Sequence, residues 1–300
     1  VEFLNQGNLP ATAANFEKAL RNMAEVLDSI RSEPGFAELS EDEKDSLTAM
    51  KQLSHDKSAL GLAYISMRLG ETKRSIELYN AAVAGRREIY ERRTGMAPLK
   101  AELAGTVGNY GQSLLWIRDL DGATPLLEES VTLYEALHTQ DPQNAGHTRA
   151  LSTAQYRLAT LRDMQGDQVA ESAGLFEASR SLRAELFSKS GDQKNQINLM
   201  LASARSGQVE EARKHIDELG ASEGTDGELH LERARALAQL ARHVDENAKA
   251  AVLDEAVAAT QRAVDEGYQD PFRVNAEPDL ESLRSREDFK AIVTNLQQQQ

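Results

Sequence analysis

The sequence contains no cysteine, and only 5% of its residues are aromatic. The lack of cysteine excludes disulfide bonds and thiol chemistry within this sequence. Prolines are also few, seven in 300 residues, and no run of β-branched residues alternates over the length of a strand. Ala and Leu dominate the 40% of residues that are hydrophobic. This composition is typical of an all-helical chain with a core.

Positive charge is in deficit, with 34 Lys and Arg against 48 Asp and Glu, a net charge of −14. Nucleic acid is therefore not an expected partner, since its binding depends on cationic contacts to phosphate. No apolar run approaches the roughly 20 residues of a membrane-spanning helix, so we expect no direct membrane insertion. No signal-like segment follows Val1. We therefore expect a cytoplasmic fragment of a longer protein.

Residues 55–83 have the pattern of two amphipathic helices folded back to back. Gly61 and Tyr64 share one face of the first helix, and Gly70 interrupts the pattern. Ser75, Tyr79 and Ala82 then form a second stripe at helical spacing. Small residues alternate with large ones, which allows two helices to pack closely. This arrangement resembles a tetratricopeptide repeat, a helix–turn–helix unit that stacks into a solenoid.

The same pattern recurs along the chain at about 40 to 50 residues, longer than the usual repeat of roughly 34 because several second helices are extended. The equivalent positions are Gly61, Gly111, Ala159 and Met200. The resemblance implies an all-α fold, a right-handed α-α superhelix of antiparallel helix pairs. Ser40 and Glu43 form a capping box that predicts the start of a long helix before the central repeat.

We expect residues 1–219 to form the repeat array and residues 220–300 to continue the same solenoid. The segment from Gly220 to Glu228 is rich in small and polar residues and predicts a flexible break. One more helical pair follows it. A short C-terminal helical cap is then expected to cover the last repeat, with Leu280, Leu283, Phe289 and Ile292 as its buried residues. Low-complexity Gln297 to Gln300 is expected to be disordered.

Two motifs carry a second resemblance. A DPxN loop contains Asp141, Pro142 and Asn144, and the C-terminal part reads AVDEGYQDP and then EPDLESLRSREDF. Both are similar to the C-terminal repeat regions of bacterial serine/threonine protein kinases. The resemblance implies a tail that recruits substrates or partners, or that senses a signal. The kinase domain itself is absent, because the glycine loop, the catalytic-loop Asp with its Asn, and the metal-binding DFG are missing.

No other pattern predicts catalysis, a metal or a cofactor. Arg118-Asp119-Leu120 imitates part of a kinase catalytic loop, but a helix end is the favoured interpretation. The glycines of GTVGNYG have the wrong spacing for a dinucleotide-binding loop and fall inside a predicted helix. His215 with Glu218, and His243 with Glu246, have metal-compatible spacing but lack further ligands. We therefore expect no enzyme activity, no metal and no cofactor.

The densest basic cluster lies on an extended second helix. We interpret it as a solvent-exposed helix extension, with docking of an acidic partner as the alternative. Interleaved acidic residues neutralise part of its charge. The cluster consists of Arg86, Arg87, Arg92 and Arg93.

The resemblance implies that the first helix of each pair lines a concave groove that binds a ligand. Asn109, Arg157 and Asn198 occupy equivalent positions, where an amide or a guanidinium can hold a peptide. An ordinary surface is the alternative interpretation. Ser58, Leu62 and Thr153 replace the residues of a chaperone-binding carboxylate clamp, so a chaperone C-terminus is not an expected ligand. The full predicted groove set is His55, Gly105, Asn109, Gln112, Trp116, Tyr156, Arg157, Asn198 and Arg205.

The sequence therefore favours a non-catalytic scaffold that binds a protein or peptide in this groove. The alternative is a structural spacer or a self-association module, such as a homodimer, whose groove holds no specific ligand.

Overall fold

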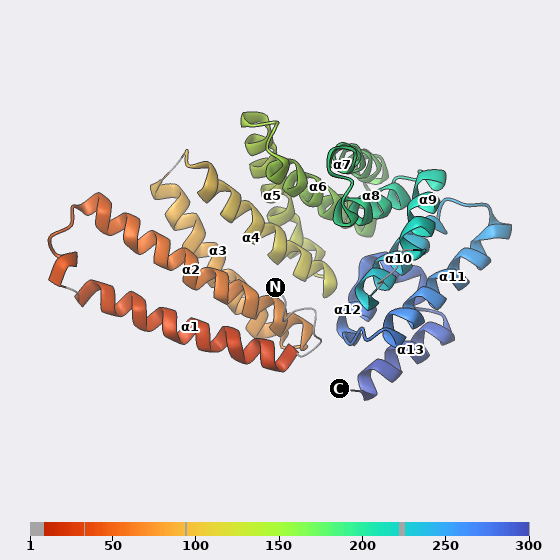
Figure 1. Cartoon of the computed structure of the whole chain (residues 1–300), viewed down its shortest axis with the longest axis horizontal. Helices are drawn as coiled ribbons and strands as arrows, with labels where there is room; N and C mark the ends of the chain where they lie inside the picture. The colour runs from red at the N-terminus through yellow and green to blue at the C-terminus, as the bar shows by residue number, and fades with distance from the viewer. Residues whose placement is uncertain (1–8, 33, 94, 222–225, 300) are drawn as a thin grey trace. The chain divides into compact units, whose positions relative to one another are not determined.

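All regular structure in the described part of the chain is helical (Figure 1). The computed structural model describes residues 9–32, 34–93, 95–221 and 226–299. Consecutive helices in these ranges pack against one another as neighbours, for example α2 on α3 and α6 on α7. The predicted all-α, solenoid-like fold is therefore confirmed. The chain divides into two compact units, Val1–Ser113 and Leu114–Gln300.

The first unit is built around a long central helix that packs against both of its sequence neighbours. The predicted capping box begins this helix: Ser40 N donates to Glu43 Oε2 at 2.9 Å, and Glu43 N donates to Ser40 Oγ at 3.4 Å. Cap and helix thus agree with the sequence prediction. The unit contains α1 (Leu9–Ser32), the 3-10 turn η2 (Pro34–Phe36), α2 (Glu41–Arg68), α3 (Thr72–Arg92) and most of α4 (Ala97–Trp116).

The small-and-large pattern of the central repeat creates the packing of the first unit. Ser75, Tyr79 and Ala82 are all buried, and Ser75 Oγ donates to the carbonyl of Ala63 at 2.7 Å. A β-carbon on Gly61 would lie 2.4 Å from the ring of Phe16. Because no side chain fits in that space, glycine permits the close approach of α1 to α2.

The second unit continues the alternation of first and second helices and ends in shorter elements. Within it, α10 packs against both α8 and α9, so helix packing is continuous across the predicted boundary between residues 219 and 220. Its elements are α5 (Leu120–Gln140), α6 (Ala145–Gln165), α7 (Val169–Ser190), α8 (Gln193–Arg205), α9 (Val209–Gly220), α10 (Gly227–Leu240), α11 (Glu246–Asp265), α12 (Pro271–Ala276), the 3-10 segment η3 (Pro278–Leu283) and α13 (Glu287–Gln298).

Turn residues in the second unit cap a helix or allow the chain to reverse direction. Asn144 of the DPxN motif caps α6, because its Oδ1 accepts hydrogen bonds from Gly146 N at 3.0 Å and His147 N at 3.1 Å. Gly166 and Gly207 follow the first helices of two pairs with φ of 79° and 75°. This left-handed conformation favours glycine and lets the chain reverse direction.

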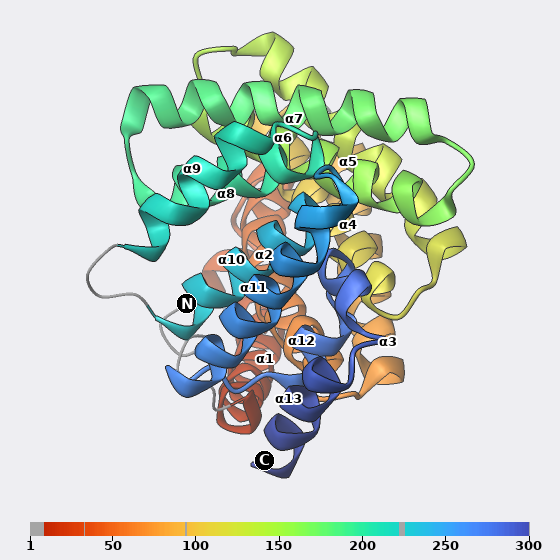
Figure 2. The same cartoon turned by 90° about the vertical axis from the view of Figure 1, so that its right-hand side faces the viewer.

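The core of the second unit extends from the repeats into the C-terminal elements. Leu280, Leu283, Phe289 and Ile292 are all buried in the cluster that contains the apolar residues of α8 to α11. Here η3 packs on α10, and α13 packs on α11 and α12 (Figure 2). The predicted burial of one face of the C-terminal segment is therefore confirmed.

Three sequence predictions differ from the structure or lie partly outside its described residues. Gln297 and Gln298 belong to α13, so the expected disorder is wrong for them, and Gln300 lies outside the described residues. The predicted break from Gly220 to Glu228 also lies partly outside them. Arg86 is buried, not exposed as expected for a helix extension. Its Nη1 donates to the carbonyl of Glu102 on α4 at 2.8 Å, so it links two helices.

Arg183 repeats this link in the second unit, from α7 to α8. Its Nη1 donates to the carbonyl of Asn198 at 2.8 Å. Arg86 follows Tyr79, and Arg183 follows Phe176, at the same helical spacing. The two arginines therefore mark equivalent positions at which a second helix is attached to the first helix of the next pair.

Candidate functional site

The structure divides the predicted groove residues into a buried and a more accessible group. Trp116, Tyr156 and Arg205 are 8%, 8% and 6% exposed. These three side chains are buried, so the prediction that they line an accessible groove is wrong for them. Asn109 is exposed, whereas the others are partly buried: His55, Gly105, Gln112, Arg157 and Asn198.

The buried members in the second unit are covered by the C-terminal segment of the same chain. The hydroxyl of Tyr156 donates to Oδ2 of Asp279 at 3.0 Å. Nε of Arg205 donates to Oδ1 of the same carboxylate at 2.7 Å. The ring of Trp116 meets Phe272 of α12 edge-on, with 6.1 Å between centroids. The segment thus occupies positions that the sequence assigned to a ligand.

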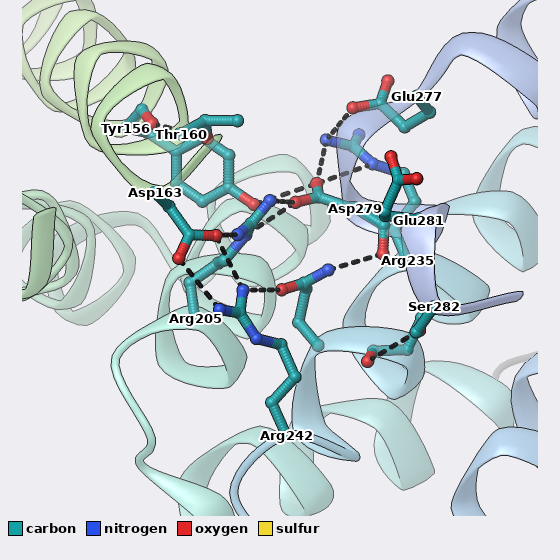
Figure 3. A network of polar contacts seen from close by, with 12 residues as sticks. Tyr156, Thr160, Asp163, Arg205, Arg235, Arg242, Glu277, Asp279, Glu281 and Ser282 are labelled. Atoms are coloured by element: carbon teal, nitrogen blue, oxygen red, sulfur yellow. Dashed lines mark hydrogen bonds and ion pairs between the residues drawn. The ribbon is translucent and has the colours of Figure 1, made fainter. Parts of the chain in front are cut away.

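Asp279 is the centre of this arrangement, and its carboxylate binds side chains from three first helices (Figure 3). Besides Tyr156 on α6 and Arg205 on α8, Arg235 on α10 donates from Nε at 3.0 Å and from Nη2 at 2.6 Å. We call these four residues the Asp279 site. The two guanidinium groups supply the charge-assisted hydrogen bonds by which arginine recognises carboxylates.

The backbone next to Asp279 is bound as well. Nε2 of Gln239 on α10 donates to the carbonyl of Asp279 at 2.6 Å. Leu280 and Leu283 are fully buried in the apolar cluster. Helices α6, α8 and α10 therefore hold η3 in the way a receptor holds a short peptide. The contacts are a charged anchor, a main-chain hydrogen bond and two apolar side chains.

A second layer of carboxylates orients the two arginines. Asp163 accepts from Nη1 of Arg205 at 2.6 Å and from Nη2 of Arg242 at 2.8 Å. Glu232 accepts from Nη1 of Arg235 at 2.6 Å. Both acceptors belong to the repeat helices themselves. The position of each guanidinium is thus fixed by partners outside the C-terminal segment.

Burial and the arginines act in opposite directions on the acidic groups. Burial raises the pKa of Asp279, but Arg205 and Arg235 outweigh it and hold that pKa at about 2. Glu277 behaves differently, since its burial, reinforced by the charge of Asp279, leaves its pKa raised against the opposing effect of Arg235. Asp279 is therefore ionised at neutral pH, and its charge is balanced inside the protein.

Tyr156 is a hydrogen-bond donor in this environment. Burial and the neighbouring charge of Asp279 raise its pKa, so the hydroxyl keeps its proton at neutral pH. Its ring contacts Phe176 edge-on at 5.5 Å between centroids, and the guanidinium of Arg183 lies 4.5 Å from its centre. The arrangement can hold a carboxylate, and the one that it holds, Asp279, is only 1% exposed.

The first unit has its own polar cluster near a predicted groove residue. His55 Nδ1 lies 3.4 Å from Oδ1 of Asp56, which also accepts from Gln52 Nε2 at 2.8 Å. Burial raises the pKa of Asp56. Within the described residues, its Oδ2 has no hydrogen-bond partner. His55 thus contacts a buried carboxylate of its own helix and is itself partly exposed.

Sequence reasoning missed Arg235, Gln239 and Asp279. Asp279 belongs to the motif EPDLESL, which indicated a family resemblance but no contact. A signal exists for Arg235, because Leu231 and Ala238, about one helical turn before and after it, are buried. A charge inside an otherwise apolar helix face requires a buried counter-ion. That reasoning predicts a partner without saying which one.

Two negative findings apply to the described ranges alone. No cluster of three or more His, Asp or Glu side chains there could hold a metal ion. His215 lies 3.4 Å from Glu218 and packs edge-on against Phe187. In the same ranges, no helix combines the length and the apolar character needed to cross a bilayer.

Comparison with known proteins assigns no family to the chain. No protein-family profile and no curated protein matches the chain. Among solved structures, the chain is similar to BtubC (BKLC) from P. vanneervenii, with 14% identity over 87% of this chain and 93% of that chain. The TM-score is 0.47.

Proposed function

We propose that this chain is a non-catalytic protein-interaction scaffold of the tetratricopeptide type. It binds a peptide or protein partner along the first helices of its pairs. The Asp279 site supports this proposal, because three such helices, α6, α8 and α10, together hold a short segment by its carboxylate and backbone. The same helices can hold an external segment by the same chemistry wherever the chain's own segment does not cover them.

The accessible positions for such a partner are Asn109, Arg157 and Asn198. Asn109 is exposed on α4, and the other two are partly buried on α6 and α8. An amide binds a peptide backbone through its donors and acceptor, and a guanidinium binds a carboxylate. We therefore assign partner contacts to these residues rather than to Tyr156 and Arg205, which bind Asp279.

The proposed biological setting is the regulatory or substrate-recruiting tail of a larger bacterial protein, such as a serine/threonine kinase. The motifs AVDEGYQDP and EPDLESLRSREDF support this parentage. Their residues have distinct structural roles: Asp270 caps α12 by accepting from Arg273 N at 3.0 Å, and Asp279 anchors η3. A cytoplasmic location belongs to the same proposal.

A matched pair of double variants tests this function. Asn109→Ala with Arg157→Ala is expected to weaken capture of a partner at least tenfold, since hydrogen bonds to charged groups contribute roughly 1.5–3 kcal/mol. Asn80→Ala with Arg87→Ala makes the same chemical changes at exposed positions of α3 and should leave capture unchanged. Both variants should keep the melting temperature of the wild type.

The readout is quantitative mass spectrometry of cross-linked partners, followed by affinity measurement with the purified partner. Sedimentation of the isolated chain is measured in parallel. Full-strength binding by the Asn109→Ala, Arg157→Ala variant would contradict the assigned surface. A stable dimer that captures no partner would instead favour a spacer or self-association module.

A further inference from the structure

We infer that the Asp279 site is a receptor for acidic segments, and that the chain's own residues 277–283 occupy it in competition with a partner. The inference rests on the proposed function and names the class of partner. That partner carries an aspartate followed by leucines at the next and the fourth position, the pattern of Asp279, Leu280 and Leu283. Binding requires the partner to replace η3.

The receptor is assembled independently of the segment that it holds. Arg205 pairs with Asp163, and Arg235 pairs with Glu232, at 2.6 Å in each case. These carboxylates lie on α6 and α10, the same helices that carry the donors Tyr156 and Arg235. Departure of η3 therefore leaves both guanidinium groups oriented toward the position of the missing carboxylate.

The vacated receptor would select strongly for a carboxylate. The side chains of Arg205 and Arg235 are only 2% and 12% exposed. When Asp279 departs, Arg205 keeps Asp163 and Arg235 keeps Glu232, but both lose the carboxylate that they share, and losing a charge partner in a buried environment is unfavourable. A segment with Asn or Ala at the anchor position would not relieve this cost, so the site discriminates against neutral segments.

The chain's own segment has attachments that can be separated from the anchor. Leu280 and Leu283 supply the apolar contact. The flanking helix α13 packs on α11, and its own residues Phe289 and Ile292 are buried in the apolar cluster. Because a tethered segment competes at an effective concentration of order millimolar, a free peptide binds the wild type weakly. Removing the carboxylate of Asp279 removes the charged anchor of the tethered segment, so the segment competes less well although it stays attached.

The test uses the full chain and a labelled peptide with the sequence of residues 277–283, blocked at both ends, in fluorescence anisotropy titrations. The Asp279→Ala chain should bind this peptide at least tenfold more tightly than the wild type. A peptide with Asn in place of its aspartate should lose that binding. So should the chain that carries Arg205→Ala in addition to Asp279→Ala.

Asp265→Ala is the matched control, because it removes an exposed aspartate of α11 and should behave as the wild type. Leu283→Ala provides a second test that keeps every ion pair of the site. It weakens the apolar contact of the tethered segment and should also increase peptide binding. Circular dichroism and sedimentation establish that each variant is folded and monomeric.

A folded Asp279→Ala or Leu283→Ala chain that binds the peptide no better than the wild type would overturn the inference. Equal binding of the aspartate and asparagine peptides would overturn it as well. These outcomes leave the proposed function untouched, since that function is tested through Asn109 and Arg157. Loss of partner capture in those variants, together with failure of the peptide titration, would locate partner binding away from the Asp279 site.

Discussion

Nε of Arg205 donates to Oδ1 of Asp279 at 2.7 Å, across a separation of 74 residues in the sequence. Both side chains are almost completely buried, at 2% and 1% exposed. The contact joins the end of α8 to η3 and removes Arg205, a position of the predicted groove, from solvent. The polar residues of the inner helices in the second unit therefore bind the chain's own C-terminal segment.

Breaking this pair from one side should destabilise the protein strongly. Arg205→Met leaves Asp279 with fewer partners in a buried environment, and we expect a loss of about 3–5 kcal/mol in the free energy of unfolding. Chemical denaturation measures this value. Arg213→Met is the control, since its partner Glu255 is half exposed and such pairs contribute about 1 kcal/mol or less. Equal losses in the two variants would contradict the assigned importance of burial.

The pH dependence of stability should contain a contribution from Asp279. Its folded-state pKa of about 2 lies below the ordinary value of 3.8. Its stabilising contribution is therefore complete above about pH 5 and is lost as the pH falls toward 2. A shift of nearly two units corresponds to about 2 kcal/mol. Glu277, whose pKa is raised by burial, has the opposite sign, since its contribution is lost as the pH rises through its raised pKa.

The measurement compares wild type with Asp279→Asn between pH 7 and pH 3. The difference between their unfolding free energies should shrink as the pH falls below about 5, because Asp279 in the unfolded chain, with its ordinary pKa of 3.8, takes up a proton while the folded carboxylate stays largely ionised. Because the charge of Asp279 helps to raise the pKa of Glu277, the comparison is repeated with Glu277→Gln in both proteins, which removes that second contribution. Two curves that remain parallel over the whole range would contradict the lowered pKa.

Gly61 should show opposite responses to Ala in two backgrounds. In the wild type, the new β-carbon meets the ring of Phe16 at 2.4 Å, and overpacking of this kind costs about 1–3 kcal/mol. In a Phe16→Ala background the space is open, and Gly61→Ala should stabilise α2 by up to about 1 kcal/mol through helix propensity. A double-mutant cycle by urea denaturation gives the coupling. The same sign in both backgrounds would mean that the ring does not limit the helix approach.

The C-terminal elements should be needed for the integrity of the second unit. Removing residues from 271 onward deletes Leu280, Leu283 and Phe289 from the core and exposes the apolar surface that they cover. The shortened chain should aggregate or unfold at a clearly lower temperature, since terminal repeats need a polar outer surface. Light scattering and thermal melting test this. A monomeric product of unchanged melting temperature would show that these elements are dispensable.

Trp116 should report the docking of α12, because it is the single tryptophan of the chain and is 8% exposed. Phe272→Ala removes the ring that contacts it edge-on. The emission maximum should then move to longer wavelength as water reaches the indole, and the secondary structure should stay unchanged. Phe187→Ala, which removes a ring packed on His215 instead, should leave the emission unchanged.

The repeated part of the fold could be predicted because its signal is local. Ser75, Tyr79 and Ala82 share a helix face, and their spacing alone predicts the burial that the structure shows. Asn144 was noticed in the DPxN motif, and its capping contacts span only two and three residues. Such features depend on neighbours in the sequence, so periodicity and turn chemistry are enough to find them.

The candidate site depends on long-range contacts, which periodicity does not specify. Tyr156 and Arg205 were found as polar residues on inner helices, but their partner Asp279 lies 123 and 74 residues away. Arg86 was misread for another reason, because it was grouped with the arginines next to it in the sequence. It shares a helix face with the buried residues Val83 and Ile89, and its guanidinium binds Glu102 and Thr106 of the next helix. The residue types were informative, whereas the identity of their partners required the structure.

The long sequence separations of the Asp279 contacts also affect how the second unit is made. In an ordinary solenoid, each repeat contacts only its neighbours and folding can propagate along the chain. Here the partner of three repeat residues is Asp279, which lies 123 residues after Tyr156, 74 after Arg205 and 44 after Arg235. During synthesis, α6, α8 and α10 leave the ribosome before Asp279, and until it follows Arg205 and Arg235 have only the carboxylates of the repeat helices as partners. We therefore expect the unit to be completed late, when one residue joins α6, α8 and α10.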